Sequence, residues 1–139
     1  MLAGTQSNRE LALKLLSEGS YAQCIDLLQK ALTEQGDEID LHLYLAYAYA
    51  KDGKMHDSVE ALEHATDLFP TSAKVHYNLG VAYQRIHNNT QAKEEYLRAL
   101  GLDANYIQAK HALDQMLNAA HIATPGLNPE PPASAAAQA

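Results

Sequence analysis

The sequence repeats itself every 34 residues, and this period constrains the fold more than any other feature. Ala12, Ala46 and Gly80 are small residues at this spacing, and each follows a leucine. The same offset relates Cys24, Ser58 and Ala92, then Leu28, Leu62 and Tyr96, and then Ala31, Ala65 and Ala99. A fixed period of about 20–50 residues is typical of stacked units that bury their apolar faces on one another. We therefore expect three copies of one unit.

Each unit is predicted to form two helices joined by a tight turn. The turns are expected at residues 18–20, 52–54 and 86–89, and the breaks between units at 36–38, 70–72 and 104–106. Gly19 and Gly53 tolerate the left-handed conformation that ends many helices. In the third turn, Asn88 or Asn89 is expected to take the place of glycine.

The aligned positions resemble those of the tetratricopeptide repeat (TPR) family, whose units also have 34 residues. Numbered in units of 5–38, 39–72 and 73–106, the sequence places residues typical of the family at Gly80, Tyr83, Ala92, Tyr96 and Ala99. The resemblance implies an all-α fold, a right-handed α-solenoid of three helix-turn-helix units plus a capping helix.

The capping helix is predicted over residues 107–120. The last unit of a stack leaves one apolar face uncovered, and an amphipathic helix at this place would cover it. The domain would then span residues 5–120, after an N-terminal extension of residues 1–4. Residues 121–139 are rich in proline and alanine and show no sustained period, so they are predicted to form a disordered tail.

Gly80 interrupts a segment that otherwise predicts an amphipathic helix. Glycine in a helix interior costs about 1 kcal/mol relative to alanine, which suggests that another part of the chain comes close to the backbone there. We interpret Gly80 as a packing position where the two helices of the third unit nearly touch. Leu79, Tyr83 and Tyr96 are expected in the seam between them.

No pattern in the sequence predicts catalysis, a metal site or a cofactor. There is no phosphate-binding glycine loop, nucleophile elbow, HExxH motif or CxxC motif. His42 and His76 stand one repeat apart, roughly 10 Å or more, and are expected to fill a core position rather than to share a metal. Cys24, the single cysteine, is expected to be a small buried residue. Glu94 and Glu95 are assigned to the solvated face of a helix.

In the TPR family the first helices of successive units line a concave groove that binds a partner, and the resemblance implies the same here. The groove residues that it implies are Arg9, Leu13, Leu43, Tyr44, Tyr47, Lys74, Tyr77, Asn78, Val81, Gln84 and, from the capping helix, His111. The basic residues at the margins are Arg9, Lys51, Lys74 and Arg85. Together they predict an apolar, tyrosine-lined floor rimmed by charge. For Leu13, Leu16 and Leu43, lateral packing on neighbouring helices stays open as an alternative.

One subtype of the family can be compared residue by residue. Its co-chaperones hold a C-terminal EEVD carboxylate with two lysines, two asparagines and an arginine, whose equivalents here are Arg9, Leu13, Tyr44, Lys74 and Asn78. Only Lys74 matches, with Arg9 as a stand-in, and the missing polar groups have become leucine and tyrosine. The comparison therefore favours an apolar helix or extended peptide as the ligand.

Three functions remain as hypotheses. The leading one is a non-enzymatic interaction module, a scaffold or adaptor that binds a peptide or helix of a partner protein in this groove. The second is a dedicated chaperone for a hydrophobic client, similar to three-repeat secretion chaperones. The third is a self-assembling homo-oligomer, because acidic residues outnumber basic ones in residues 5–72 but not in residues 73–106.

Composition narrows the partner and the compartment. The net charge of −7 disfavours nucleic acid, because binding to phosphates depends on lysine and arginine. The longest mainly apolar run, residues 41–50, is too short to span a membrane. A single cysteine fits a reducing compartment, and the sequence opens without a signal-peptide pattern. We therefore expect a cytoplasmic protein with a protein or peptide partner.

Overall fold

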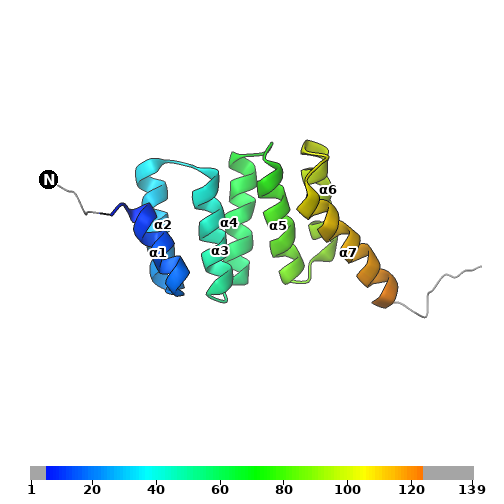
Figure 1. The fold of residues 1–139 in the computed structure, drawn as a ribbon, viewed down its shortest axis with the longest axis horizontal. Coiled ribbons are helices and arrows are strands. Elements are labelled where there is room, and N and C mark those ends of the chain that lie inside the picture. The colour runs from blue at the N-terminus through cyan, green and yellow to red at the C-terminus, as the bar shows by residue number, and fades with distance from the viewer. Residues whose placement is uncertain (1–5, 124–139) are drawn as a thin grey trace, which may run out of the picture.

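The computed structural model describes residues 6–123 of the chain. Its helices are α1 (Asn8–Glu18), α2 (Tyr21–Gln35), α3 (Ile39–Lys51), α4 (Met55–Leu68), α5 (Ala73–Arg85), α6 (Asn89–Leu102) and α7 (Ile107–Ala123). They stand side by side in a row that starts at α1 and ends at α7 (Figure 1). The strongest contacts join α1 to α2, α3 to α4 and α5 to α6, and α7 packs on α6. The predicted all-α solenoid of three helix pairs and a capping helix is confirmed.

The end of the capping helix differs from its prediction. Helix α7 continues to Ala123, whereas the sequence predicts its end at residue 120. Residues 121–123 contain neither proline nor glycine, so nothing in them opposes another helical turn. The predicted extension at residues 1–4 and the rest of the predicted tail, residues 124–139, lie outside the described residues.

Side-chain caps begin two of the first helices of the repeats. The Ser7 hydroxyl accepts a hydrogen bond from the Glu10 N–H at 3.1 Å, and the Ser72 hydroxyl accepts one from the Val75 N–H at 3.2 Å. The first N–H groups of a helix have no partner within the helix, and such caps supply one. The starts of α1 and α5 are therefore defined by local sequence.

The turn inside each repeat contains one residue in the left-handed conformation. Its φ angle is 83° at Gly19, 83° at Gly53 and 65° at His87. The prediction that Asn88 or Asn89 takes this role in the third turn is wrong. His87 stands 34 residues after Gly53, so the turn keeps the register of the repeat although its residue is not glycine. Asn88 instead caps α6, where its side chain accepts a backbone N–H.

Buried side chains form two clusters along the row. One joins α1, α2 and α3 and includes Ala12, Cys24 and Leu28, and the other extends from α3 to α7 and includes Leu79 and Tyr83. The expectation for Cys24 is confirmed, because the residue is fully buried and its thiol donates a hydrogen bond to the Ala12 carbonyl oxygen. Each repeat thus shares its core with its neighbours, as stacked units require.

Gly80 lies where α5 meets the ring of Tyr96 on α6. A methyl group added at Gly80 would lie 2.6 Å from Tyr96 Cε1 and 3.2 Å from the Ala92 carbonyl oxygen. The ring of Tyr96 is 1% exposed and therefore has no free space into which it could move. The predicted packing role of Gly80 is confirmed, and the group that requires it is mainly the tyrosine ring.

We predict that Gly80→Ala destabilises the protein. The new methyl group overlaps Tyr96, and overpacking of a core costs about 1–3 kcal/mol, which exceeds the gain in helix propensity of about 1 kcal/mol. Gly101→Ala on α6 is the matched control, because nothing lies within 4 Å of its added methyl group. Urea denaturation followed by circular dichroism measures both free energies of unfolding. If Gly80→Ala were as stable as Gly101→Ala, the packing argument would be wrong.

Candidate functional site: a groove between α3 and α5

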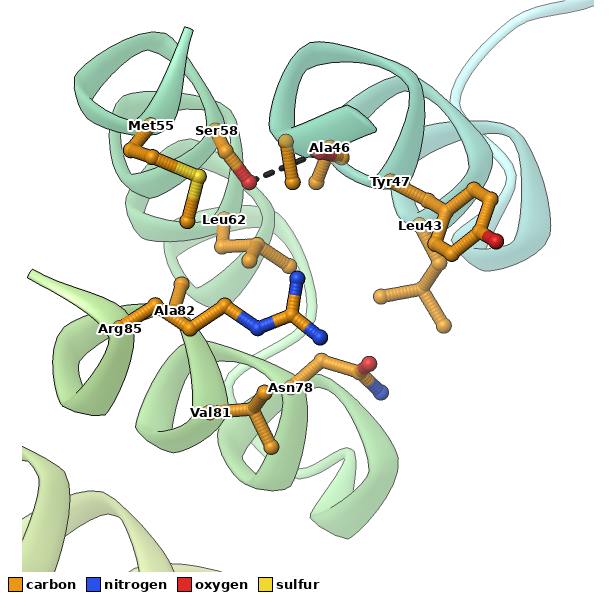
Figure 2. Close-up of a pocket in the computed structure, with 11 residues that line it drawn as sticks. Leu43, Ala46, Tyr47, Met55, Ser58, Leu62, Asn78, Val81, Ala82 and Arg85 are labelled. Atoms are coloured by element: carbon orange, nitrogen blue, oxygen red, sulfur yellow. Dashed lines mark hydrogen bonds between the residues drawn. The ribbon is translucent and has the colours of Figure 1, made fainter. Parts of the chain in front are cut away.

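An open cavity lies between the first helices of the second and third repeats, α3 and α5, and α4 supplies part of its wall (Figure 2). Its volume is about 90 Å³. The lining residues are Leu43, Ala46, Tyr47, Ala50, Met55, Ser58, Leu62, Asn78, Val81, Ala82 and Arg85. Most of these side chains are apolar, and a few polar groups stand at the edge. Such a site suits an apolar side chain of a ligand.

Four of the predicted groove residues meet in this cavity. They are Leu43 and Tyr47 on α3, and Asn78 and Val81 on α5. They come together because α3 and α5 are equivalent helices of successive repeats and contact each other directly. The Tyr47 side chain is 48% exposed, whereas Leu43 and Val81 are half-buried and also pack against the core. Lateral packing, left open for Leu43, therefore accounts for part of its burial.

The sequence assigns Ala46, Ser58 and Leu62 to the core, and it missed their second role as the wall of the cavity. All three are buried, and the Ser58 hydroxyl donates a hydrogen bond to the Ala46 carbonyl oxygen at 2.8 Å. This bond satisfies the hydroxyl donor and leaves an apolar wall (Figure 2). The small residues that the repeat places in each helix pair are the signal that could have indicated this space.

Two basic side chains border the cavity at the C-terminal ends of its helices. Lys51 Nζ lies 5.8 Å from the centroid of the Tyr47 ring, within the range of a cation–π contact. The Arg85 side chain reaches from α5 over the cavity, and its guanidinium lies between the side chains of Leu62 and Asn78 in Figure 2. The open tyrosine face of this groove is therefore flanked by positive charge.

Arg9 and Lys74, which the sequence predicts at the groove margin, lie near the starts of α1 and α5. Arg9 Nη1 pairs with Glu38 Oε1 at 2.6 Å, and Lys74 Nζ pairs with Asp40 Oδ1 at 3.4 Å. Asp40 Oδ2 also lies 4.0 Å from Arg9 Nη2. The two cations that come closest to a carboxylate clamp are thus paired with carboxylates of the chain itself.

Tyr77 and Tyr44 are predicted groove residues that pack against neighbouring helices instead of lining the cavity. The Tyr77 ring centroid lies 5.8 Å from that of Tyr96 and 5.4 Å from that of Tyr106, between α5, α6 and α7. Tyr44 is half-buried against the cluster of the first repeat. Both side chains face the next helix of the stack, whose position the spacing within one helix cannot show.

The other predicted groove residues are Leu13, Gln84 and His111, and none of them lines the cavity. Leu13 is half-buried on α1, and His111 is exposed on α7. Gln84 is exposed and accepts a hydrogen bond from the Tyr96 hydroxyl at 2.8 Å. The structure therefore divides the predicted groove into a central cavity and scattered surface positions.

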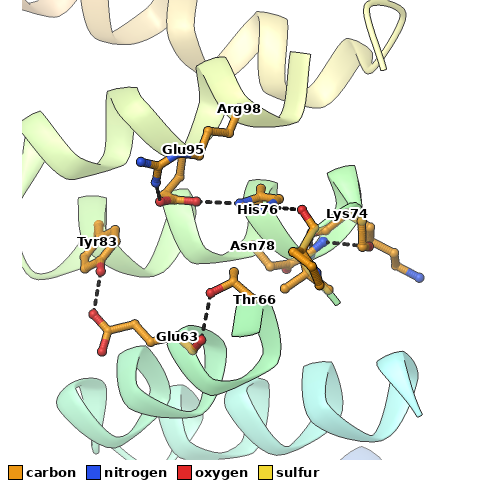
Figure 3. A network of polar contacts seen from close by, with 11 residues as sticks. Glu63, Thr66, Lys74, His76, Asn78, Tyr83, Glu95 and Arg98 are labelled. Atoms are coloured by element: carbon orange, nitrogen blue, oxygen red, sulfur yellow. Dashed lines mark hydrogen bonds and ion pairs between the residues drawn. The ribbon is translucent and has the colours of Figure 1, made fainter. Parts of the chain in front are cut away.

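A buried polar cluster outside the cavity centres on His76 (Figure 3). His76 Nδ1 lies 2.7 Å from Glu95 Oε1, and His76 Nε2 lies 2.8 Å from the Pro70 carbonyl oxygen. Glu95 also pairs with the Arg98 guanidinium. Glu95 is 6% exposed, so the prediction that it lies on the solvated face of α6 is wrong. A buried carboxylate needs partners, and a histidine from the other helix of the pair provides one.

The same position of the second repeat holds His42, which is also buried and lies 2.9 Å from Asp37. The expectation that His42 and His76 fill a core position is confirmed. Among the described residues, no group of three histidine, cysteine or acidic side chains is arranged to hold a metal ion. No helix in this same part of the chain has the length and apolar character needed to cross a membrane.

Buried tyrosines of the third repeat hold their protons strongly. Burial raises the pKa of Tyr96 to about 12, and its interaction with Tyr77 adds to the shift. Burial, followed by the hydrogen bond to Glu63, also raises the pKa of Tyr83. The Tyr83 hydroxyl donates that bond from α5 to α4, so it links the second and third repeats (Figure 3).

The architecture defines the class of protein as a solenoid of repeated helix hairpins. The tetratricopeptide repeat profile matches residues 39–72 and 73–106, which are the second and third units of the row. Solved TPR domains share the fold over most of this chain. The chain belongs to the tetratricopeptide repeat family.

Curated relatives are larger proteins that contain a similar region. The chain is 34% identical over 95 residues to a protein O-mannosyl-transferase of Caenorhabditis elegans, a match that covers 68% of this chain and 14% of that protein. It is 26% identical over 115 residues to the Hsp70-Hsp90 organising protein of Plasmodium falciparum, with 81% and 45% covered. The chain spans less than half the length of each of these two relatives.

Solved structures with a similar fold include several TPR domains. The first TPR domain of Spaghetti (RPAP3), bound to the HSP90 peptide SRMEEVD, has a TM-score of 0.72 at 24% identity and covers 81% of this chain and 89% of that one. MamA has a TM-score of 0.68 at 26% identity, with 78% and 63% covered. PcrH, in complex with the chaperone binding region of PopB, has a TM-score of 0.67 at 11% identity, with 76% and 88% covered.

We predict that Glu95→Ala lowers the free energy of unfolding by about 1–3 kcal/mol, because it leaves the buried His76 without its carboxylate partner. Glu94→Ala removes the same charge from the neighbouring exposed position and is expected to change stability by less than about 0.5 kcal/mol. Urea denaturation of the two variants at pH 7 measures the difference. Equal stability of the two variants would show that the His76 contact contributes nothing.

Alkaline pH is predicted to destabilise the fold through Tyr96. Its pKa of about 12 in the folded chain lies above the ordinary value of 10.0, so the unfolded chain loses this proton first as the pH rises. This contribution to stability is complete below pH 10 and is lost as the pH rises toward 12. Unfolding free energies measured across this range should fall, and less steeply in Tyr96→Phe. A decline of equal steepness in both proteins would contradict the assignment.

Proposed function

We propose that the chain is a non-enzymatic interaction module, a scaffold or adaptor, that binds an apolar peptide or helix of a partner protein between α3 and α5. The observation that carries the proposal is the half-exposed Tyr47 ring beside an apolar cavity that both helices line. Large aromatic side chains at the centre of an interface contribute much of the binding energy, and a pocket beside them anchors the partner.

The similar domains support this class of function. The RPAP3 domain that shares this fold is bound to a peptide of HSP90, and PcrH is in complex with a segment of PopB. The TPR fold is in general a non-enzymatic interaction fold. The match to an O-mannosyl-transferase covers 14% of that enzyme and carries no catalytic role to this chain. The cytoplasm remains our expected compartment, on the basis of the single cysteine.

A dedicated chaperone for a hydrophobic client is the second candidate. The likeness to PcrH favours it, together with a cavity whose walls are mainly apolar. The two candidates differ in the number of clients. An adaptor is expected to bind a short segment shared by several proteins, whereas a dedicated chaperone would keep one client soluble when the two are co-expressed. Self-assembly is the third, and sedimentation at several protein and salt concentrations would detect it.

The proposal predicts that Tyr47→Ala weakens binding of apolar peptides about tenfold while the melting temperature changes by less than about 3 °C. The loss of a central aromatic contact costs binding energy, but Tyr47 contributes little to the core. The binding measurement uses peptides that the full chain selects from a random display library. Tyr77→Ala is unsuitable for this test, because Tyr77 packs on Tyr96 and Tyr106.

Leu97→Ala is the matched control for Tyr47→Ala. Leu97 on α6 is likewise 48% exposed and does not line the cavity. Its replacement removes an exposed apolar side chain of similar exposure and is expected to leave peptide binding unchanged. The proposed function fails if no apolar peptide is enriched, or if both variants lose binding equally.

A further inference from the structure

The two ends of the groove differ in the state of their positive charges. At the N-terminal ends of the first helices, Arg9 is paired with Glu38, and Lys74 is paired with Asp40. Asp40 lies between the two cations, at 3.4 Å from Lys74 Nζ and 4.0 Å from Arg9 Nη2. An acidic ligand at this end would have to displace carboxylates that already belong to the chain.

At the C-terminal ends of α3 and α5 the cations have no such partner. Within the described side chains, no carboxylate oxygen lies within the 4.0 Å limit of an ion pair from Lys51 or Arg85. The two residues stand 34 positions apart, so they occupy the same place on neighbouring first helices. Positive charge at this end of the groove is therefore available to a ligand.

The position of Arg85 at a helix end does not by itself explain the direction of its side chain. A cation in the last turn of a helix is stabilised by the partial negative charge of the helix terminus. The Arg85 guanidinium, however, lies over the apolar cavity, close to the Asn78 amide in Figure 2. A strongly polar group beside an apolar pocket fits a ligand that presents both kinds of group.

We infer that the partner segment carries an acidic side chain next to its apolar anchor. The apolar side chain occupies the cavity beside Tyr47 and Val81, and the carboxylate pairs with Arg85, with Lys51 adding to the local potential. This inference rests on the proposed function and specifies the chemistry of its ligand. It places the acidic group at the opposite end of the groove from Arg9 and Lys74.

Selection of peptides by the full chain from a random display library tests the inference. We expect the enriched peptides to combine an apolar anchor with aspartate or glutamate within a few residues of it. For one enriched peptide, replacement of the acidic residue by its amide should weaken binding about two- to fivefold, the size of one partly exposed ion pair. This difference should shrink as the salt concentration rises.

Charge-removing variants locate the acidic group. Arg85→Gln is expected to bind the acidic peptide and its amide form equally well, while it keeps the preference for the apolar anchor. Lys14→Gln, an exposed position on α1, removes the same charge far from the cavity and is expected to keep the difference. Circular dichroism confirms that each variant is folded before its affinity is compared.

Three outcomes would overturn the inference. Apolar peptides without an acidic preference would leave the proposed function standing and reject the charge assignment. Loss of the acidic preference in Lys74→Gln instead of Arg85→Gln would place the carboxylate at the other end of the groove. Failure to enrich any apolar peptide would reject both the proposed function and the inference drawn from it.

Discussion

The contact between Gly80 and Tyr96 is the constraint on which the third repeat depends. Because glycine has no side chain, α5 can approach α6 until the tyrosine ring fills the space between them. Ala12 and Ala46 occupy the same position in the other two repeats and are also buried. A small residue at this place allows each helix pair to close, and closed pairs can then stack through shared clusters of buried side chains.

This packing also decides which side chains remain for a partner. Helix α5 contacts α4 and α6, and Tyr77 packs on tyrosines of α6 and the loop before α7. The surface left between α5 and α3 contains the cavity beside Tyr47. The charges divide in the same way, since Asp40 and Glu38 pair with basic residues at one end of the groove. The other end keeps the cations that face the cavity.

The fold could be predicted because the 34-residue period repeats a local pattern that is complete within each unit. The same register explains His87, whose left-handed conformation follows from its distance to Gly53 and not from its residue type. Glu95 could not be assigned in this way. Its burial depends on His76 from the other helix of the pair and on Arg98, and a single charged residue in a helix pattern does not show that such partners exist.

The sequence by itself determined the three repeated units, their two-helix form and the capping helix, because periodicity shows which face of each helix is apolar. Only the tertiary structure decided which predicted groove residues are open. Tyr47 and Tyr77 both belong to the predicted groove surface, yet one is half-exposed beside a cavity and the other packs against two tyrosines. Exposure depends on side chains from neighbouring helices, whose distances are set when the repeats stack.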